Sequence, residues 1–163
     1  MKLSNSFTLA EMLRSNTADS LGIESQFNPP QQIIDNLTEL CKNVLQPIRD
    51  SLKRPLRVTS GYRSPELNDK IRGSKTSQHM KGEAADIELW INGVERNGIL
   101  LDEVLNLFFT GRIIFDQLII EFPDENDVPK WLHISYSKKN RMEVLIARKN
   151  SLGKTYYEKV ENI

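Results

Sequence analysis

The chain has 163 residues, which is enough for one domain with a sizeable core. Its 22 basic and 22 acidic residues balance to a formal net charge of zero, so composition gives no support to a nucleic-acid or membrane-surface role. Cys41 is the single cysteine, which excludes an intramolecular disulfide. Its place in an apolar helical pattern is typical of a small buried side chain.

The chain shows no repeats, no low-complexity tract and no Gly/Ser linker. We therefore expect a single domain over residues 1–163, and we expect it to act as a monomer. An apolar run long enough for a signal peptide or a membrane span is also lacking. We expect synthesis in the cytoplasm without a signal peptide, and neither membrane insertion nor nucleic-acid binding.

Helical signals dominate the first third of the chain. A capping box predicts a short helix over residues 8–15. A polar stretch follows, and the two prolines at 29–30 then lead into a long helix over about residues 31–52, whose apolar residues recur at helical spacing. Pro47 lies inside this helix, so we expect it to kink the helix or end it early.

Strand patterns dominate the rest of the chain. The expected elements are a strand at 56–59, a short helix at 64–71, a loop at 73–82, a strand at 84–89, a helix at 97–110, and strands at 115–122, 131–137 and 143–148. The last three strands follow one another directly, which favours antiparallel pairing. The order predicts an α+β fold, with a small antiparallel sheet and helices packed on one of its faces.

The chain contains only two histidines, His79 and His133. His79 precedes Asp86 by seven positions, and His133 lies in the middle of a predicted strand. Two neutral imidazoles and one carboxylate suit a catalytic zinc site, because three protein ligands leave a fourth position for water or substrate. Gly82 would let the loop between His79 and Asp86 fold back tightly. On spacing alone, a surface His79 and a hydrogen-bonded strand His133 fit the sequence equally well, and other divalent metals also fit.

The segment Ser77–Asp86 resembles the S-x-H-x-x-G-x-A-x-D signature of the M15 peptidases. This group includes zinc D-Ala-D-Ala carboxypeptidases and endolysin peptidases, and it shares its fold with the hedgehog domain. Residues 131–134 resemble the group's second ligand motif, residues 58–64 its upstream strand and turn, and residues 7–13 its compact phage- and prophage-associated branch. The resemblance implies a hedgehog/DD-peptidase-like fold.

By this resemblance, His79, Asp86 and His133 are ligands of a zinc ion that activates water for attack on a peptide bond. A carboxylate should take the proton of that water. Several branches of the family place this carboxylate three residues before the last histidine, where this chain has Lys130.

Our candidate for the catalytic base is Glu121, because residues 115–121 resemble the strand of the hedgehog domain whose glutamate lies near its zinc. Period-two geometry also allows it, since it can bring Glu121 to the face that carries His133. A solvated Glu121 at the strand end is the other interpretation. Three acids on the following loop stay open as alternative bases: Asp124, Glu125 and Asp127.

Three further residues are candidates for substrate binding. The resemblance implies that Arg63 binds a substrate carboxylate, which a guanidinium can do with two hydrogen bonds. A surface arginine paired with Glu66 or Asp69 is an equal alternative. Ser77 could bind substrate or brace its loop, and Gln117 could polarise the scissile carbonyl.

The resemblance thus predicts a zinc metallopeptidase that hydrolyses a peptide bond in the peptidoglycan stem peptide, as a D,D-carboxypeptidase or an endolysin-type enzyme. A prophage-derived lysis protein fits the missing signal peptide, and such a protein would act on the cell wall after release. The alternative is a catalytically inactive zinc-binding structural or interaction protein of the same fold. Lys130 favours this alternative, whereas Glu121 favours the enzyme.

Overall fold

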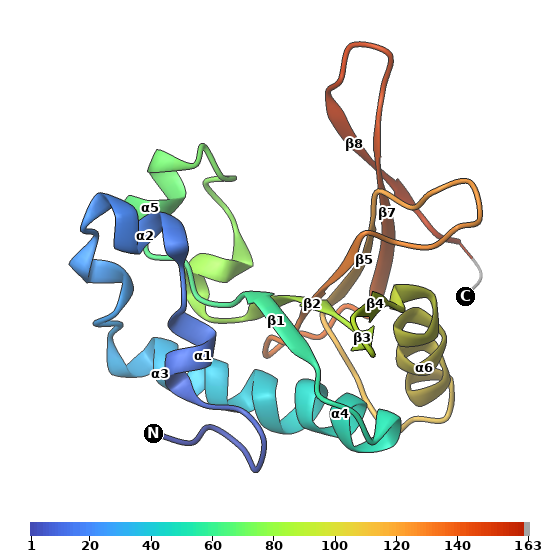
Figure 1. Cartoon of the computed structure of the whole chain (residues 1–163), viewed down its shortest axis with the longest axis horizontal. Helices are drawn as coiled ribbons and strands as arrows, with labels where there is room; N and C mark the ends of the chain where they lie inside the picture. The colour runs from blue at the N-terminus through green and yellow to red at the C-terminus, as the bar shows by residue number, and fades with distance from the viewer. Residues whose placement is uncertain (162–163) are drawn as a thin grey trace.

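A six-stranded sheet forms the centre of the computed structural model, which describes residues 1–161 (Figure 1). The strand order is β1-β2-β6-β5-β7-β8. The strands are β1 (Arg57–Ser60), β2 (Ala84–Glu88), β5 (Gln117–Glu121), β6 (Trp131–Ser135), β7 (Glu143–Lys149) and β8 (Thr155–Lys159). The mixed helix and strand content confirms the predicted fold class.

The prediction of a small, antiparallel sheet was wrong in two respects. The sheet has six strands, and β7 pairs in parallel with β5 instead of antiparallel with β6. The reason is that β6 already lies between β2 and β5, so neither of its edges is free. The chain therefore adds β7 to the free edge of β5. Both β5 and β7 run antiparallel to β6, so they run parallel to each other.

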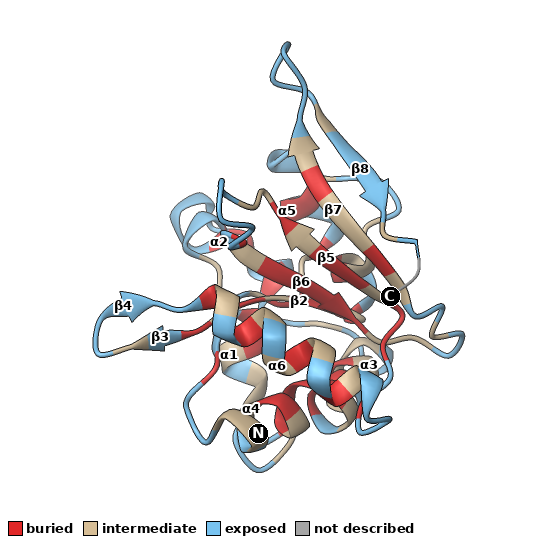
Figure 2. Cartoon of the chain, turned by 90° about the vertical axis from the view of Figure 1, so that its right-hand side faces the viewer, coloured by how far each residue is buried: buried red, intermediate tan, exposed pale blue. Residues whose placement is uncertain are grey.

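Helices cover one face of the sheet (Figure 2). The long helix runs through α3 (Gln31–Leu40), a π-helical turn, η2 (Cys41–Leu45), and α4 (Gln46–Leu52), and α6 (Asn97–Phe109) packs beside it. Pro47 does not end the helix. Instead, the N–H of Gln46 donates to the carbonyl of Cys41, five residues earlier, and this wider turn precedes the proline. Cys41 is fully buried, and burial raises the pKa of its thiol to about 12.

The N-terminal region holds three short helices. In α1 (Leu9–Leu13) the side chain of Thr8 accepts the backbone N–H of Glu11 at 3.3 Å, as the capping box predicts. The helix α2 (Asn16–Leu21) and the 3-10 helix η1 (Glu24–Gln26) were not predicted. Only Ala18 of α2 is buried, so the segment has no apolar period that could reveal it.

Further short elements complete the fold. The helix α5 (Pro65–Lys70) begins at the predicted cap, Ser64, and the predicted loop after it contains the 3-10 helix η3 (Gln78–Lys81). The hairpin of β3 (Trp90–Ile91) and β4 (Val94–Glu95) and the last strand β8 were not predicted. Among the described residues no helix is both long and apolar enough to span a bilayer.

The two faces of the sheet differ as period-two geometry requires. Leu118, Leu132 and Ile134 belong to the core under the helices. The alternate residues lie on the opposite face, where Ile119 pairs with His133 and Glu121 pairs with Trp131. The faces of β5 and β6 therefore coincide in the predicted way, and Glu121 lies diagonally beside His133.

Gly82 allows the tight return of the chain between η3 and β2. Its φ is +67°, and a Cβ there would lie 2.8 Å from the carbonyl oxygen of Ile33 on α3. We expect Gly82→Ala to lower the free energy of unfolding by about 2–5 kcal/mol, from left-handed strain plus overpacking. Gly22→Ala is the matched control, because Gly22 has φ +65° with nothing within 4 Å. Chemical denaturation measures both, and equal losses would show that the contact with Ile33 costs nothing.

Candidate metal centre

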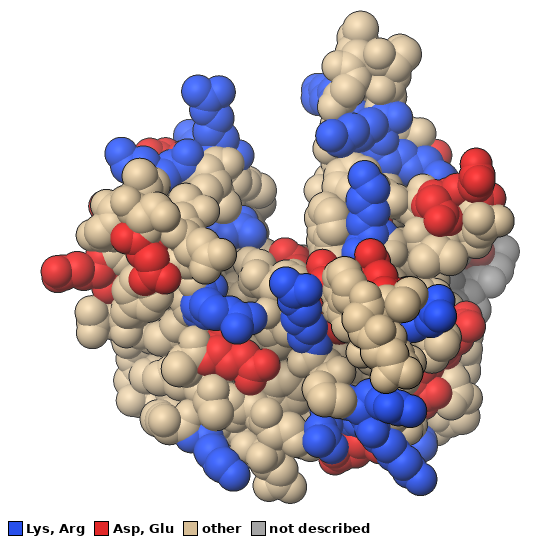
Figure 3. Space-filling view, in the orientation of Figure 1, with Lys and Arg blue, Asp and Glu red and all other residues tan. Residues whose placement is uncertain are grey.

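The face of the sheet opposite the helices carries an open cleft of about 1700 Å³. Figure 3 shows it as a deep notch between two lobes. One wall contains the β7–β8 hairpin, and the opposite wall contains the segment between α5 and η3 (Figure 1). All seven residues selected from the sequence line this cleft: Arg63, Ser77, His79, Asp86, Gln117, Glu121 and His133.

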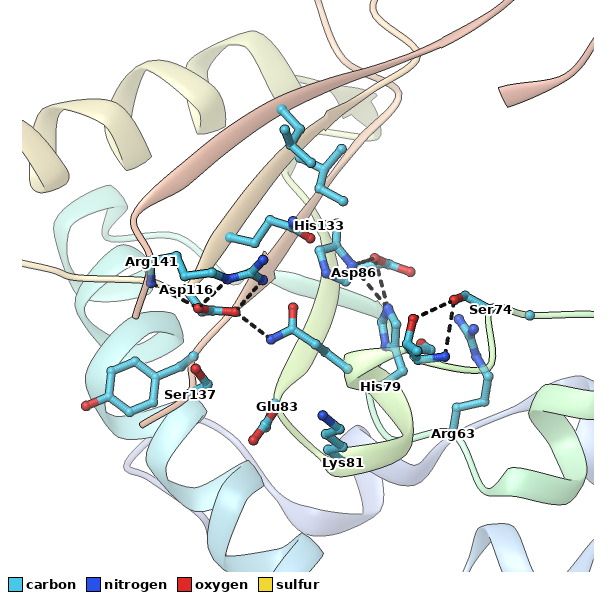
Figure 4. Close-up of a pocket in the computed structure, with 18 of the residues that line it drawn as sticks. Arg63, Ser74, His79, Lys81, Glu83, Asp86, Asp116, His133, Ser137 and Arg141 are labelled. Atoms are coloured by element: carbon cyan, nitrogen blue, oxygen red, sulfur yellow. Dashed lines mark hydrogen bonds and ion pairs between the residues drawn. The ribbon is translucent and has the colours of Figure 1, made fainter. Parts of the chain in front are cut away.

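Three chain segments bring His79, Asp86 and His133 together (Figure 4). Asp86 is the middle residue of β2 and pairs directly with His133, the middle residue of β6. Directly opposed residues of paired strands project from the same face, so their side chains meet. His79 lies on η3, which the turn at Gly82 folds back over the start of β2.

The three candidate ligand atoms form a tight triangle. His79 Nε2 lies 3.2 Å from His133 Nδ1 and 3.4 Å from Asp86 Oδ1, and Asp86 Oδ1 lies 3.0 Å from His133 Nδ1. A tetrahedral zinc ion with ligand distances of about 2.0–2.1 Å holds its ligand atoms roughly 3.3 Å apart. The spacing of the three atoms therefore fits one zinc ion without rearrangement.

A hydrogen bond behind the site sets the orientation of His79. Its Nδ1 lies 2.7 Å from the carbonyl oxygen of Gly61, so Nδ1 carries the proton and donates to that oxygen. In the neutral ring Nε2 is then unprotonated, and its lone pair points into the triangle. A backbone carbonyl behind a histidine is a common way to fix the tautomer that a metal requires.

Asp86 is an anion in this setting. Burial by itself raises the pKa of its carboxyl. When the imidazoles of His79 and His133 are protonated, their charges and hydrogen bonds outweigh burial and hold the pKa of Asp86 below its usual value. Within residues 1–161 these three side chains form the one group whose His, Cys, Asp or Glu atoms could share an ion. Two imidazoles and one anionic carboxylate give the donor set of a catalytic zinc site, although their role as ligands stays a prediction.

Glu121 lies in the same cleft but outside the triangle. It is 8% exposed, so it is not the solvated strand-end residue of the alternative interpretation. Burial, reinforced by the negative charge of Asp86 and opposed by His133, raises the pKa of Glu121 to about 7. A carboxyl with that pKa exchanges protons near neutral pH, which is the property of a general base or acid.

The other candidate bases lie away from the cleft. Lys130 is exposed and is not among the residues that line the cleft. Asp124, Glu125 and Asp127 are exposed on the connection between β5 and β6 and do not line the cleft either. Asp124 instead accepts the backbone N–H groups of residues 126 and 128, so it shapes that turn. Of the four acids considered as the base, Glu121 is thus the one that lines the cleft.

Arg63 does not form the surface ion pair of the alternative interpretation. Its Nη1 donates to Asn68 Oδ1 at 3.3 Å, and within residues 1–161 no carboxylate lies within 4.0 Å of its guanidinium. Burial lowers the pKa of Arg63, and Asp86 partly opposes this effect. The group remains cationic, since its pKa is ordinarily far above neutral. Arg63 therefore offers unused donors to an anion in the cleft.

The other two substrate-binding candidates, Ser77 and Gln117, differ in whether their side chains are already hydrogen-bonded. Ser77 lines the cleft at the start of η3, and its hydroxyl makes no cap bond to that helix. Gln117 also lines the cleft, but its Nε2 donates to Glu143 Oε2 at 2.8 Å. One of its two amide N–H groups is therefore engaged, which leaves the second N–H and the side-chain oxygen of Gln117 for other contacts.

A buried carboxylate braces one side of the cleft, and sequence analysis missed it. Arg141 donates to Asp116 from its backbone N–H, Nε and Nη2, and Gln78 Nε2 donates to Asp116 Oδ2 at 2.7 Å (Figure 4). The hydrogen bonds of Arg141 outweigh burial and hold the pKa of Asp116 below its usual value. Because Gln78 precedes His79, Asp116 ties the segment that carries a candidate ligand to β5. Its partners lie 25 and 38 residues away, so no local pattern reveals it.

A mainly antiparallel sheet with a His–Asp–His group in an open cleft defines an α+β protein with a candidate metal centre of the hydrolytic kind. A family model described as Peptidase M15 matches residues 5–100, which is more than half of the chain. The chain belongs to this peptidase family, as the resemblance predicted. Comparison with curated proteins finds no significant match. The matched segment contains His79 and Asp86 but ends before His133, which the structure places in one group with them.

Proposed function

We propose that the protein is a zinc metallopeptidase that hydrolyses a peptide bond in the stem peptide of peptidoglycan. The observation that carries the proposal is the triangle of His79, Asp86 and His133 at zinc-ligand spacing, beside a buried carboxyl whose pKa is about 7. Membership of the M15 peptidase family supplies the reaction class. A divalent ion at the three atoms would supply Lewis-acid activation of water and of the scissile carbonyl.

Glu121 would act as the general base and then as the general acid. At neutral pH a carboxyl with a pKa of about 7 is partly ionised, so Glu121 can accept a proton from the attacking water. In its protonated form it can donate that proton to the leaving amine. Glu121 is a diagonal neighbour of His133 on one sheet face, so the two backbones lie roughly 7–8 Å apart and both side chains line the same cleft.

Arg63 would orient the substrate. Stem peptides carry free carboxylates, and a guanidinium binds a carboxylate with two parallel hydrogen bonds. Arg63 reaches the cleft from the wall opposite the β7–β8 hairpin, and in the described part of the chain, residues 1–161, it has no carboxylate partner. It would thus place one end of the peptide while the triangle and Glu121 act on the bond. The substrate lies in the cell wall, so the protein would act there after release.

The direct test is digestion of purified sacculi and a panel of synthetic stem peptides by the zinc-loaded protein, with products identified by mass spectrometry. We expect shortened stem peptides, loss of activity after chelation, and recovery when zinc is returned. The products also identify the bond, because D-Ala-D-Ala, L-Ala-D-Glu and cross-bridge cleavage release different fragments. A zinc-loaded protein that leaves sacculi and the whole panel intact would be the inactive zinc-binding protein, and the proposal would fail.

A further inference from the structure

The last strand of the sheet, β8, contributes little to the core, although it lies beside the cleft. Four of the five residues of β8 are exposed, and Thr155 is half-buried. The β7–β8 hairpin nevertheless stands as one wall of the cleft (Figure 1). From β8, the two residues that line the cleft are Thr155 and Tyr157.

Strand register places Tyr157 in line with the candidate base. Tyr157 pairs with Ala147 on β7, and Ala147 pairs with Glu121 on β5. Two strand spacings put the backbones of Tyr157 and Glu121 roughly 10 Å apart. The residue between them is an alanine, so no bulky side chain separates the phenol from the carboxyl. Ala147 is fully buried, which shows that its neighbours close over it.

The chemistry of this phenol suits a neutral hydrogen-bond donor. Burial, followed by the negative charges of Glu121 and Asp86, raises the pKa of Tyr157 above its ordinary value near 10. The phenol is therefore protonated at neutral pH. Tyr157 also lines the same cleft as both of these acids.

The geometry points to Tyr157 as a further catalytic residue, which contacts the substrate from the hairpin wall of the cleft. This inference rests on the proposed function. When water attacks the scissile carbonyl carbon, the electron pair of the C=O bond moves onto the carbonyl oxygen, which becomes negative. The phenol O–H of Tyr157 donates a hydrogen bond to that oxygen, and the proton stays on Tyr157 throughout. A donor fixed before the reaction stabilises the developing charge without reorganisation.

The test compares Tyr157→Phe with Tyr156→Phe in the zinc-loaded full chain. Tyr156 is the adjacent residue of the same strand, is 40% exposed and does not line the cleft. Two readouts are combined: steady-state kinetics on a stem peptide that the wild type cleaves, and calorimetric binding of a phosphinic pseudopeptide, whose tetrahedral anion mimics the attacked carbonyl. Zinc affinity and thermal unfolding are measured alongside. Because Tyr157 is 55% exposed, its loss to phenylalanine should leave folding intact.

We expect Tyr157→Phe to lower kcat at least tenfold, within the roughly 10²–10³-fold ceiling for one such donor. KM should change little, phosphinate binding should weaken about tenfold or more, and Tyr156→Phe should match the wild type in every measurement. Unchanged kcat and phosphinate affinity in Tyr157→Phe overturn the inference, as does a rise in KM alone, which indicates uniform binding. If the wild type binds the phosphinate but cleaves no stem peptide, only the proposed substrate fails, and the binding arm decides the role of Tyr157. A wild type that does neither overturns both.

Discussion

Replacing His133 with glutamine is expected to abolish peptide hydrolysis and to weaken zinc binding by more than about 100-fold. Even the loss of a group that merely orients a ligand costs about 10–100-fold in metal affinity, so loss of a ligand itself costs more. Glutamine fills most of the space of histidine, which limits the cavity at a site that is only 8% exposed. Titration with zinc and a chelating indicator, together with stem-peptide digestion, measures both effects.

Lys130→Ala is the matched control for His133→Gln. Lys130 lies three residues earlier in the chain, is exposed and does not line the cleft. We expect it to retain wild-type zinc affinity and activity, although several M15 branches place a carboxylate at that position. A folded His133→Gln variant that binds zinc and hydrolyses stem peptides like the wild type would remove His133 from the centre. Asp86→Asn repeats the test with an isosteric change, because it removes only the charge.

Glu121→Gln is expected to lower kcat by about 10²–10⁴-fold while zinc affinity and fold remain unchanged. The amide has the size of the carboxyl but cannot accept the proton of the attacking water. Zinc affinity should persist because Glu121 is not part of the triangle. Glu125→Gln, on the exposed connection after β5, is the matched control and should keep full activity. Full activity in Glu121→Gln would remove Glu121 from the role of base, and a loss of activity in Glu125→Gln alone would move that role to the connection.

The pH profile gives an independent check on Glu121. A base works in its ionised form, so activity should rise as pH increases through the pKa of Glu121, which is about 7. A nearby cation favours the ionised form, so the rise in the zinc-loaded protein should be centred at or below pH 7. The residual activity of Glu121→Gln should lack this rise. A rise of the same midpoint in the variant would mean that another group titrates.

Local signals in the sequence predicted much of the fold. The cap at Thr8, the cap at Ser64 and the apolar period of α6 identified three helices, because each signal is complete within one or two turns. The parallel pairing of β7 with β5 depends on which sheet edge is free, and no local pattern contains that information. β8 was missed because four of its five residues are exposed, so its sequence has no alternation of apolar and polar residues. Its place in the sheet depends on backbone pairing with β7.

The candidate site was also predictable only where the signal is local in the sequence. Period two was enough to place Glu121 and His133 on one face, and the signature around His79 was enough to connect it with Asp86. The register that sets Asp86 opposite His133 could not be read from either strand alone. The brace at Asp116 and the position of Tyr157 depend on partners in distant strands. The face on which a strand residue lies was thus predictable, whereas its exact partner on the neighbouring strand was not.

The spacing of the candidate ligands along the chain would couple metal binding to the stability of the protein. His133 follows His79 by 54 residues and Asp86 by 47, so an ion held by all three would be a removable cross-link between two distant stretches of chain. An unfolded chain has no preformed site, so the binding free energy of the ion would add directly to the stability of the native state. Zinc depletion would then increase the susceptibility of the protein to proteolysis and would also abolish its activity.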